Sequence, residues 1–586
     1  MNIKDIIEQK LSEVILNVYQ LKDINLEVQE NKTEFEGDFT IVTFPLVKQL
    51  KKNPESIGVE LGEALTEQTE LFESFNVVKG FLNVKVKNQF FVDNFRSVSN
   101  GFSTIEKKNA TVMVEYSSPN TNKPLHLGHI RNNLLGFSVA QILKEAGYDV
   151  IKTQIINDRG IHICKSMLAW EKFGNGETPE TTHTKGDKFV GNYYVEFDKN
   201  YKKEIAELVG QGVEEEQAKK DAPMIKEAQK MLVDWENGDE TVRNLWAEMN
   251  SWVYKGFNET YKRLGVDFDQ VQYESNTYIL GKDLIQEGLD KGVLYQKEDG
   301  SVWCDLTDEG LDQKLLLRSD GTSVYMTQDL GTAVERFKQN DIQKLIYTVG
   351  NEQDYHFQVL FKILKKLGYQ WADQLFHLSY GMVELPEGKM KSREGTVVDA
   401  DDLMQEMYET AKSKAQELGK LETLTEEDKE ASYETVGLGA LKYFMLKVDP
   451  KKKMLFNPAE SIDFNGNTGP FIQYTYARIQ SLLAKAGTLQ TETADIELNQ
   501  SEKELIMQLA NFKTVVAKSA ETLSPALVAN YVYDLVKTYN SFYQNNPILN
   551  QEDENVKQFR LNISDLTAKT IKKALELLGI GTVNRM

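Results

Sequence analysis

One short stretch, Ser118–His129, constrains the fold of this chain more than any other, and it holds two of the six histidines, His126 and His129. A strand-like apolar run, Thr111–Tyr116, comes directly before it, and a segment with helical apolar spacing follows. The two histidines and Gly128 are therefore expected where a strand turns into a helix. Unpaired backbone N–H groups and the positive end of the helix dipole favour a phosphate there. The pattern predicts a nucleotide-binding turn; a proline-bearing turn with two surface histidines is the alternative.

Further strand-like runs place this turn in a parallel sheet. A second run, Val150–Ile156, ends at a polar turn, Asn157–Gly160, and another helical pattern follows. A strand, a helix and a strand in this order predict a βαβ unit, with ligands at the carboxyl ends of the strands. The pattern resumes at Leu345–Gly350 and Phe376–Tyr380. The long, charged and mostly helical segment from about 170 to 300 is interpreted as an insertion between the halves of a nucleotide-binding fold.

Size, composition and charge limit the class of protein. A length of 586 residues predicts about three to five domains, and 41% hydrophobic with 27% charged residues is typical of a soluble protein. Two cysteines, Cys164 and Cys304, exclude a disulfide framework and a four-thiolate zinc site. Neither a secretory signal nor a membrane-spanning run is found, so we expect a cytoplasmic protein without bound zinc or another metal of its own. A net charge of −21 argues against a protein that coats nucleic acid non-specifically. A specific nucleic-acid partner could still bind local basic surface.

A second chemical signal follows the last strand, in a loop between Gly388 and Gly395. The loop concentrates four cationic or hydroxyl side chains: Lys389, Lys391, Ser392 and Arg393. Such a loop could close over a polyphosphate and neutralise the charge on a leaving pyrophosphate. A solvated basic turn is the alternative.

The two signals together resemble the class I aminoacyl-tRNA synthetases, whose signature motifs are named HIGH and KMSKS. The closer resemblance is to the arginyl-tRNA synthetases, and these segments carry it: Glu115–Asn120, Lys123–Arg131, Tyr325, Thr327, Asp329, Val349–Phe357, Tyr380–Val383, Gly469–Arg478, Leu577–Ile580 and Met586. The resemblance implies an α/β multidomain protein. Its Rossmann-like parallel-sheet core would be split by a helical insertion, with a small N-terminal α/β domain and an all-α C-terminal anticodon-binding domain.

The expected domains follow from these patterns. They are an N-terminal tRNA-contacting domain (1–105), the first half of the catalytic domain with the HIGH-type motif (106–170), the helical insertion (171–300), the second catalytic half (301–385), the KMSKS-type loop with connecting helices (386–455) and the helical anticodon-binding domain (456–586).

The resemblance also implies the chemistry. The carboxylate of L-arginine would attack ATP, with Mg²⁺ present and pyrophosphate leaving, and arginine would then pass to the 3′ end of tRNA(Arg); activation would need tRNA, and the protein would be a monomer. Catalytic roles are expected for Lys123, His126, Gly128, His129, Lys389, Lys391 and Ser392. ATP would be bound by Pro124, His126, His129, Gly350, His356, Lys389 and Met390.

A guanidinium substrate needs carboxylates in fork geometry and a rigid wall, which favours Glu115, Asp329 and Tyr325. With the positions that the resemblance adds, the arginine site would comprise Glu115, Ser117, Asn120, His126, Tyr325, Asp329 and Gln353. Taken alone, Glu115 would be a strand-end carboxylate facing water, Asp329 a helix N-cap and Tyr325 a core residue.

The chain departs from the KMSKS pattern at Ser392, where a second lysine is expected, and Lys391 comes one residue early. Lys123 lies on the same turn as His126, so we hypothesise that it supplies the missing cation.

The C-terminal helices are rich in tyrosine and phenylalanine, on which unpaired anticodon bases could stack. Most of these aromatic residues also have the spacing of a buried helix face. Tyr474, Arg478 and Met586 are the expected tRNA contacts.

Other functions fit the sequence less well. Free-standing nucleotidylyltransferases share the histidine turn but lack the insertion and the helical domain. A non-catalytic RNA-binding relative would have lost the histidines or the lysine loop. Among class I enzymes, the cysteinyl, glutamyl and glutaminyl types remain as alternatives. A cysteine site would need zinc ligands, and a glutamate site would need cations where Glu115 and Asp329 stand.

Overall fold

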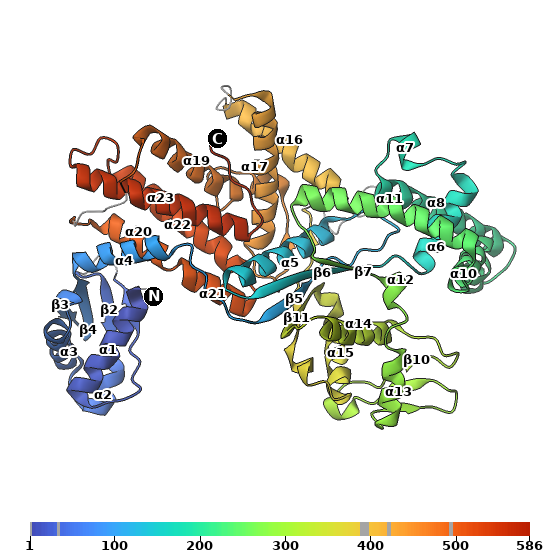
Figure 1. The fold of residues 1–586 in the computed structure, drawn as a ribbon, viewed down its shortest axis with the longest axis horizontal. Helices are drawn as coiled ribbons and strands as arrows, with labels where there is room; N and C mark the ends of the chain where they lie inside the picture. Colours follow the sequence, from blue (N-terminus) through green and yellow to red (C-terminus); the bar gives the residue numbers. More distant parts are fainter. Residues whose placement is uncertain (1–2, 32–35, 387–397, 419–423, 491–495) are drawn as a thin grey trace.

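A five-stranded parallel sheet of order β12-β11-β5-β6-β7 forms the centre of the protein (Figure 1). The computed structural model describes residues 3–31, 36–386, 398–418, 424–490 and 496–586. The strands are β5 (Thr111–Glu115), β6 (Asp149–Ile156), β7 (Gln270–Tyr273), β11 (Lys344–Gly350) and β12 (Leu375–Tyr380). Four of these match the sequence prediction. The short strand β7 was not predicted, because it lies within the segment expected to be helical.

The order of the strands creates a crevice beside β5. From β5 the chain moves outward to β6 and β7, and it later adds β11 and β12 on the other side of β5. The connections after β5 and β11 therefore leave in opposite directions and open a crevice at the carboxyl ends of these two strands.

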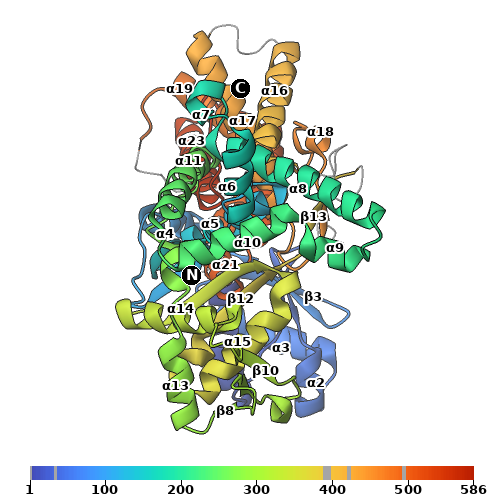
Figure 2. The ribbon, with the colours of Figure 1, turned by 90° about the vertical axis from the view of Figure 1, so that its right-hand side faces the viewer.

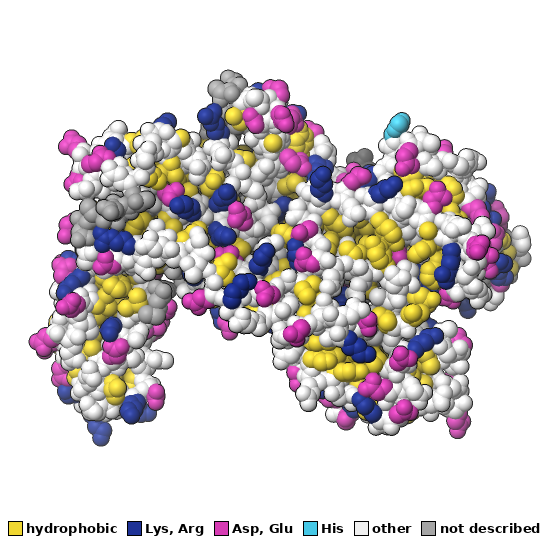
Figure 3. All heavy atoms as spheres, in the orientation of Figure 1, with side chains coloured by type: hydrophobic (Ala, Val, Ile, Leu, Met, Phe, Trp, Pro, Cys, Tyr) yellow, Lys and Arg dark blue, Asp and Glu magenta, His cyan; other side chains and the backbone are white. Residues whose placement is uncertain are grey.

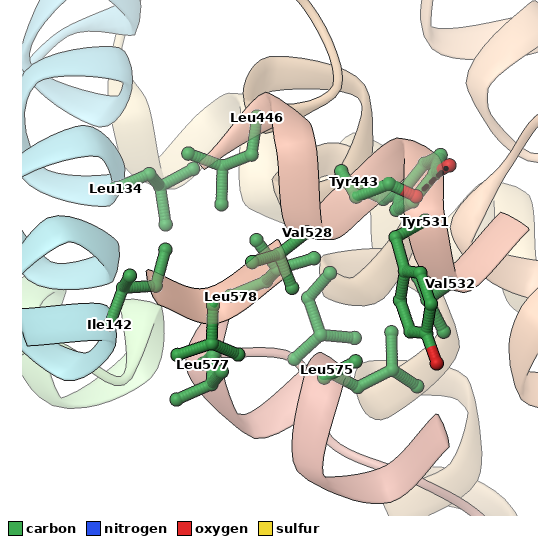
Figure 4. Packing of buried hydrophobic residues seen from close by; sticks show 14 of the residues in the cluster. Leu134, Ile142, Tyr443, Leu446, Val528, Tyr531, Val532, Leu575, Leu577 and Leu578 are labelled. Atoms are coloured by element: carbon green, nitrogen blue, oxygen red, sulfur yellow. Dashed lines mark hydrogen bonds between the residues drawn. The ribbon is translucent and has the colours of Figure 1, made fainter. Parts of the chain in front are cut away.

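Helix α5 (Leu127–Glu145) runs from this crevice into the core. It is buried on nearly all sides, since it contacts the sheet and also the helices α17, α21 and α23 of the C-terminal part. Figure 4 shows Leu134 and Ile142 beside Leu446, Leu577 and Leu578. One helix therefore has its first turn at the crevice and its body in the core that the sheet and the C-terminal helices share.

The insertion is helical as far as Leu264, as predicted. Its helices are α6 (Ile161–Phe173), α7 (Pro179–Thr182), α8 (Gly186–Gly210), α9 (Glu215–Asp221), α10 (Pro223–Glu236) and α11 (Glu240–Leu264). They form the lobe at the right of Figure 1 that faces the viewer in Figure 2. Helices α8 and α11 can approach closely because residue 256 is a glycine. A Cβ on Gly256 would lie only 2.4 Å from Oδ1 of Asp187.

A second lobe follows β7 and has its own apolar cluster. It contains α12 (Glu274–Thr277), α13 (Lys282–Asp290), β8 (Leu294–Gln296), β9 (Val302–Cys304), the 3₁₀ helix η1 (Thr307–Glu309), β10 (Lys314–Leu317), α14 (Tyr325–Gln339), η2 (Asn351–Gln353), α15 (Asp354–Lys366) and η3 (Gln370–Gln374). Strands β8 to β10 form a small antiparallel sheet. Helix α14 brings its first turns to the crevice.

The N-terminal domain is an antiparallel sheet of order β1-β2-β4-β3 with four helices. Its elements are α1 (Ile3–Tyr19), β1 (Val28–Glu30), β2 (Phe39–Val42), α2 (Phe44–Leu50), α3 (Pro54–Gln68), β3 (Phe72–Val78), β4 (Phe81–Val86) and α4 (Asn88–Gly101). It is fixed to the C-terminal helices by a buried ion pair, in which Nζ of Lys503 lies 3.1 Å from Oδ1 of Asp38.

The C-terminal part is a helical bundle. Its elements, with two short strands, are β13 (Val383–Glu384), α16 (Ala400–Leu418), α17 (Glu426–Leu446), β14 (Met454–Leu455), α18 (Pro458–Ser461), α19 (Gly469–Ala486), α20 (Gln500–Ala510), α21 (Phe512–Thr522), α22 (Ala526–Asn545) and α23 (Glu554–Leu577). Tyr531, Tyr539 and Phe542 are buried, which confirms core packing for these aromatic residues. None of the described helices is long and apolar enough to cross a membrane. On the face in Figure 3, Lys and Arg side chains lie among Asp and Glu side chains.

Candidate active site

Two histidines cap the start of α5 reciprocally. Nδ1 of His126 accepts a hydrogen bond from the backbone N–H of Gly128 at 3.1 Å, and Nδ1 of His129 accepts one from the backbone N–H of His126 at 3.2 Å. The two ring centroids lie 3.9 Å apart. The turn thus satisfies otherwise unpaired donors of the helix start with its own imidazoles.

The capping geometry and the burial fix the protonation of both rings. Burial, with the nearby Lys123 ammonium, lowers the pKa of His126 to about 4, and burial lowers the pKa of His129 as well. Both imidazoles are therefore neutral at pH 7. Because each Nδ1 accepts from a backbone N–H, the ring proton must be on Nε2. Each ring can donate one hydrogen bond to a phosphate oxygen without placing a buried positive charge in the crevice.

The histidines line a cavity of about 210 Å³ at the carboxyl ends of the central strands. Its lining is Ser118, His126, Gly128, His129, Asn132, Val349, Gly350, Glu352, Gln353, Tyr380, Met382 and Val383. The structure thus brings together five predicted residues from two distant segments: His126, Gly128, His129, Gly350 and Gln353. The other lining residues were not assigned from the sequence, although most lie inside the segments that carry the family resemblance.

Asn132 joins the three elements that meet at this cavity. Its Nδ2 donates to the carbonyl of Thr348 on β11 at 2.6 Å, and its Oδ1 accepts from the backbone N–H of Ser117 at 2.6 Å. One amide on α5 therefore fixes the spacing between the ends of β5 and β11. No motif distinguished this residue, because its role depends on contacts far apart in the sequence.

The opposite end of the crevice contains paired charges. Glu115 ends β5 and is buried, and its Oε2 forms an ion pair with Nη1 of Arg336 on α14. The Nε of Arg336 donates to Oε1 of Gln272 on β7 at 2.8 Å. Glu115 therefore does not face water, and one of its oxygens is already occupied by a guanidinium of the protein itself.

A second carboxylate, Asp329, lies in the second turn of α14 and is not a helix N-cap. Its Oδ2 lies 2.6 Å from Nε2 of His356, and its side chain is 44% exposed. Tyr325 starts the same helix, one turn earlier, and is 74% exposed, which excludes core packing. Both side chains can meet a ligand from one helix face. His356, expected to bind ATP, lies at this end and does not line the nucleotide cavity.

A third carboxylate was missed by sequence reasoning. Glu274, the first residue of α12, is 9% exposed. Burial and the charges of Asp158 and Asp329 raise the pKa of Glu274 to about 7, although Arg159 opposes the shift. With Glu115 and Asp329 it makes this end of the crevice acidic, which suits a cationic ligand.

Two predicted arginine contacts and Pro124 lie at the edge of the crevice. Ser117 is fully buried, and its hydroxyl lies 2.7 Å from that of Tyr261. Asn120 is exposed and bridges to Asn157, and Pro124 is half-buried. None of these three lines the cavity.

Lys123 is half-buried beside the histidines, and burial lowers the pKa of its ammonium. Within the described ranges it has neither a hydrogen bond nor an ion pair, so its charge is available to a ligand. Lys389, Met390, Lys391 and Ser392 lie outside the described residues. The chain that follows them returns to the histidine turn, where the backbone N–H of Leu127 donates to the carbonyl of Val398 at 3.1 Å and that of Ala400 to Leu125 at 2.9 Å.

The three expected tRNA contacts lie together in the helical part. Tyr474, Arg478 and Met586 line a cavity of about 320 Å³ with Tyr433, Phe464 and Arg585 among the other lining residues. The Arg478 guanidinium lies 4.9 Å from the ring centroid of Tyr474, and its Nη1 donates to Asn540 at 2.7 Å. An aromatic and cationic cavity of this kind suits an unpaired base.

Comparison with known proteins gives a consistent result along the whole chain. Three family models match: "Arginyl tRNA synthetase N terminal domain" at residues 1–86, "tRNA synthetases class I (R), catalytic domain" at 95–457, and "DALR anticodon binding domain" at 472–586.

Individual relatives agree with the models. The chain is 58% identical to the arginine–tRNA ligase of Flavobacterium psychrophilum, with 100% of both chains covered, and 56% identical to that of Bacteroides thetaiotaomicron, with 99% and 100% covered. Among solved structures, the Thermus thermophilus arginyl-tRNA synthetase superimposes with a TM-score of 0.79 at 25% identity, and both chains are covered completely. The arginyl-tRNA synthetase from Plasmodium falciparum has the same fold, with a TM-score of 0.75 at 21% identity over 100% and 99% of the chains.

Proposed function

Since the chain belongs to the arginyl-tRNA synthetase family, we propose that the histidine end of its crevice binds ATP and that the acidic end binds arginine. The chain is an arginine–tRNA ligase of class I, and it joins arginine to tRNA(Arg). The observation that carries the proposal is that two neutral imidazoles line a cavity at the carboxyl ends of the central strands, and that three carboxylates, Glu115, Asp329 and Glu274, come from β5, α14 and α12 beside it.

At the ATP end, His126 and His129 donate Nε2–H to phosphate oxygens, and Gly128 and Gly350 allow close approach to the backbone. Lys123 neutralises phosphate charge beside the histidines. From the family pattern, Lys389, Met390, Lys391 and Ser392 follow the departing phosphates. Pro124 shapes the histidine turn. Mg²⁺ would arrive bound to the phosphate oxygens of ATP.

At the arginine end, Asp329 receives the guanidinium, with Tyr325 as its wall. His356 orients the Asp329 carboxylate, which supports a role beside arginine in place of one beside ATP. Glu115 acts with Arg336 and Glu274 to keep the wall acidic. The α-amino and carboxylate groups of arginine are bound by Ser117, Asn120 and Gln353.

The reaction follows from this placement. One oxygen of the arginine carboxylate attacks the α-phosphorus of ATP in line, the bond to the β-phosphate breaks, and pyrophosphate leaves with the electron pair. The neutral histidines donate to the oxygens on which negative charge develops, and the lysines neutralise the leaving group. A hydroxyl at the 3′ end of the tRNA then attacks the arginyl carbonyl carbon and displaces AMP.

The tRNA contacts at Tyr474, Arg478 and Met586 place the anticodon on the helical domain (456–586), and the N-terminal domain (1–105) lies against the outer corner of the tRNA. Activation requires tRNA, and the protein acts as a cytoplasmic monomer. We also propose the following division of the rest of the chain: the insertion (171–300), the catalytic halves (106–170 and 301–385) and the loop region (386–455).

ATP–pyrophosphate exchange across the amino acids, with and without tRNA(Arg), tests this function. We expect exchange with arginine alone, and only with tRNA present. Exchange with another amino acid and not with arginine would contradict the proposal. Exchange with arginine in the absence of tRNA would contradict only the tRNA requirement.

A further inference from the structure

Arg131 is a fully buried arginine on α5, two residues after His129, and it contacts a turn that is distant in the sequence. Its Nη2 donates to the backbone carbonyls of Lys452 at 2.9 Å and Pro450 at 3.1 Å, and it lies 3.5 Å from that of Asp449. A single nitrogen therefore holds the 449–452 turn, which joins α17 to β14.

The charge of Arg131 is unusual for a buried side chain. Its Nε and Nη1 are buried and have no hydrogen-bond partner in the described part of the chain. Burial lowers the pKa of Arg131 to about 10, so the guanidinium still carries its charge at neutral pH. The phenol of Tyr380 and the carboxylate of Asp449 oppose this shift through space. A buried cation balanced mainly by carbonyl dipoles is costly, and a leucine or methionine would fill the space at lower cost.

The turn that Arg131 holds also supports one wall of the nucleotide cavity. The Pro450 carbonyl, which accepts from Arg131, also accepts from the backbone N–H of Gly381 at 2.9 Å. The backbone N–H of Met454 donates to the carbonyl of Met382 at 3.1 Å, and β13 pairs with β14 directly beyond.

Gly381 makes the approach between this wall and the turn possible. A Cβ at Gly381 would lie 2.6 Å from the carbonyl carbon of Lys452. Met382 and Val383 line the cavity with Gly128 and His129. A continuous set of contacts therefore runs from the histidine helix through Arg131 and the 449–452 turn to the 381–383 wall.

We propose that Arg131 is a positioning residue for the nucleotide: by holding the 449–452 turn it fixes the 381–383 wall at the width that the adenosine part of ATP requires, without touching ATP. This inference rests on the proposed assignment of the cavity to ATP. Among the described residues, no hydrogen bond or ion pair joins the carboxylates of the arginine end, Glu115, Asp329 and Glu274, to the 449–452 turn. Loss of Arg131 therefore weakens nucleotide binding selectively.

The test compares Arg131→Met, Arg131→Lys and Ser138→Ala in exchange assays with saturating tRNA(Arg). Ser138 is the matched control, since it is buried on the same helix and its hydroxyl donates to the Leu577 carbonyl at 2.8 Å, away from the wall. We expect Arg131→Met to raise KM for ATP about 30-fold while KM for arginine changes less than about threefold. Arg131→Lys should recover part of the loss, because an ammonium can still donate to one or two of the carbonyls. Ser138→Ala should leave both KM values near those of the wild type.

Gly381→Ala perturbs the same contacts on the side of the 381–383 wall. It replaces Arg131→Met in the test if that variant does not fold. It should also raise KM for ATP selectively, because the added Cβ pushes the wall away from the turn. Equal rises in both KM values, or a fall in kcat alone, would overturn the inference.

Calorimetric binding of a non-hydrolysable ATP analogue separates this inference from the proposed function. An inactive wild type that still binds the analogue would contradict the function alone. Unchanged analogue affinity in folded Arg131→Met and Gly381→Ala would contradict the role of Arg131.

Discussion

The two ends of the crevice bind oppositely charged groups by different physical means. The nucleotide end uses neutral donors: two imidazoles held as Nε2–H tautomers by backbone hydrogen bonds, and a helix start with its positive dipole. The arginine end uses acidic side chains that the protein has already paired, Glu115 with Arg336 and Asp329 with His356. One end is organised locally by a turn, and the other by contacts between separate elements.

The difference follows from what each ligand brings. ATP carries several negative charges and arrives with Mg²⁺, so neutral donors together with the Lys123 ammonium suffice for orientation. Arginine brings a single positive charge, which needs carboxylates that remain ionised in a partly buried place. Glu274, which has no ion pair within the described part of the chain, has its pKa raised to about 7, mainly by burial. Glu115 and Asp329, in contrast, are paired directly with Arg336 and His356.

Removal of the neutral hydrogen-bond donor His126 should have the largest effect on the exchange rate. We expect His126→Ala to lower the exchange rate at saturating substrates about 10³-fold, since both a transition-state donor and a helix cap are lost. Pyrophosphate exchange measures it, with His183→Asn as the control, because His183 is an exposed insertion residue with a φ of +49° that Asn tolerates. A loss below about tenfold would contradict a catalytic role for the nucleotide-end histidines.

Neutralisation of a carboxylate should affect only the arginine end. We expect Asp329→Asn to raise KM for arginine about 10²-fold and to leave KM for ATP within about twofold, because one charged contact to the guanidinium is lost. The control is Asp373→Asn, which removes an exposed pair with Lys365. If both KM values rose together, the two ends would not be independent.

The free cation at the nucleotide end should have a smaller effect. Lys123→Ala should lower the exchange rate at least about tenfold, since a charge contact at the transition state is lost, and Lys123→Arg should recover part of the rate. Lys172→Ala is the control, because Lys172 pairs with Glu227 on the insertion surface. A smaller loss would mean that the cation of the departing pyrophosphate comes from elsewhere.

The sequence predicted the nucleotide end better than the arginine end for a physical reason. His126, Gly128 and His129 lie within one turn, so strand and helix periodicity alone placed them at a helix start. Their reciprocal capping is also local. Gly350, in contrast, came from the family resemblance, and it ends β11.

The arginine end depends on pairs that periodicity does not reveal. Glu115 and Arg336 are 221 residues apart, and Asp329 and His356 are 27 apart on different helices. Taken alone, Glu115 would therefore have faced water, and only the family resemblance assigned it to arginine; the resemblance also assigned His356 to ATP, which stays a prediction. Glu274 was missed because β7, which leads into it, is a four-residue strand without clear alternation.

The pH dependence of the two KM values should give the smallest and most specific contrast. Because the pKa of His126 is about 4, this ring is neutral above pH 6 and contributes no titration to KM for ATP. Glu274, with a pKa of about 7, is largely protonated at pH 6 and ionised at pH 8, so the arginine end gains negative charge as the pH rises. We expect KM for arginine to fall about threefold between pH 6 and 8, and Glu274→Gln to remove this slope. Steady-state exchange across this range measures both values. A slope in KM for ATP that His126→Asn abolishes would show that the imidazole is charged in this range, and the contrast between a neutral and an ionised end would then fail.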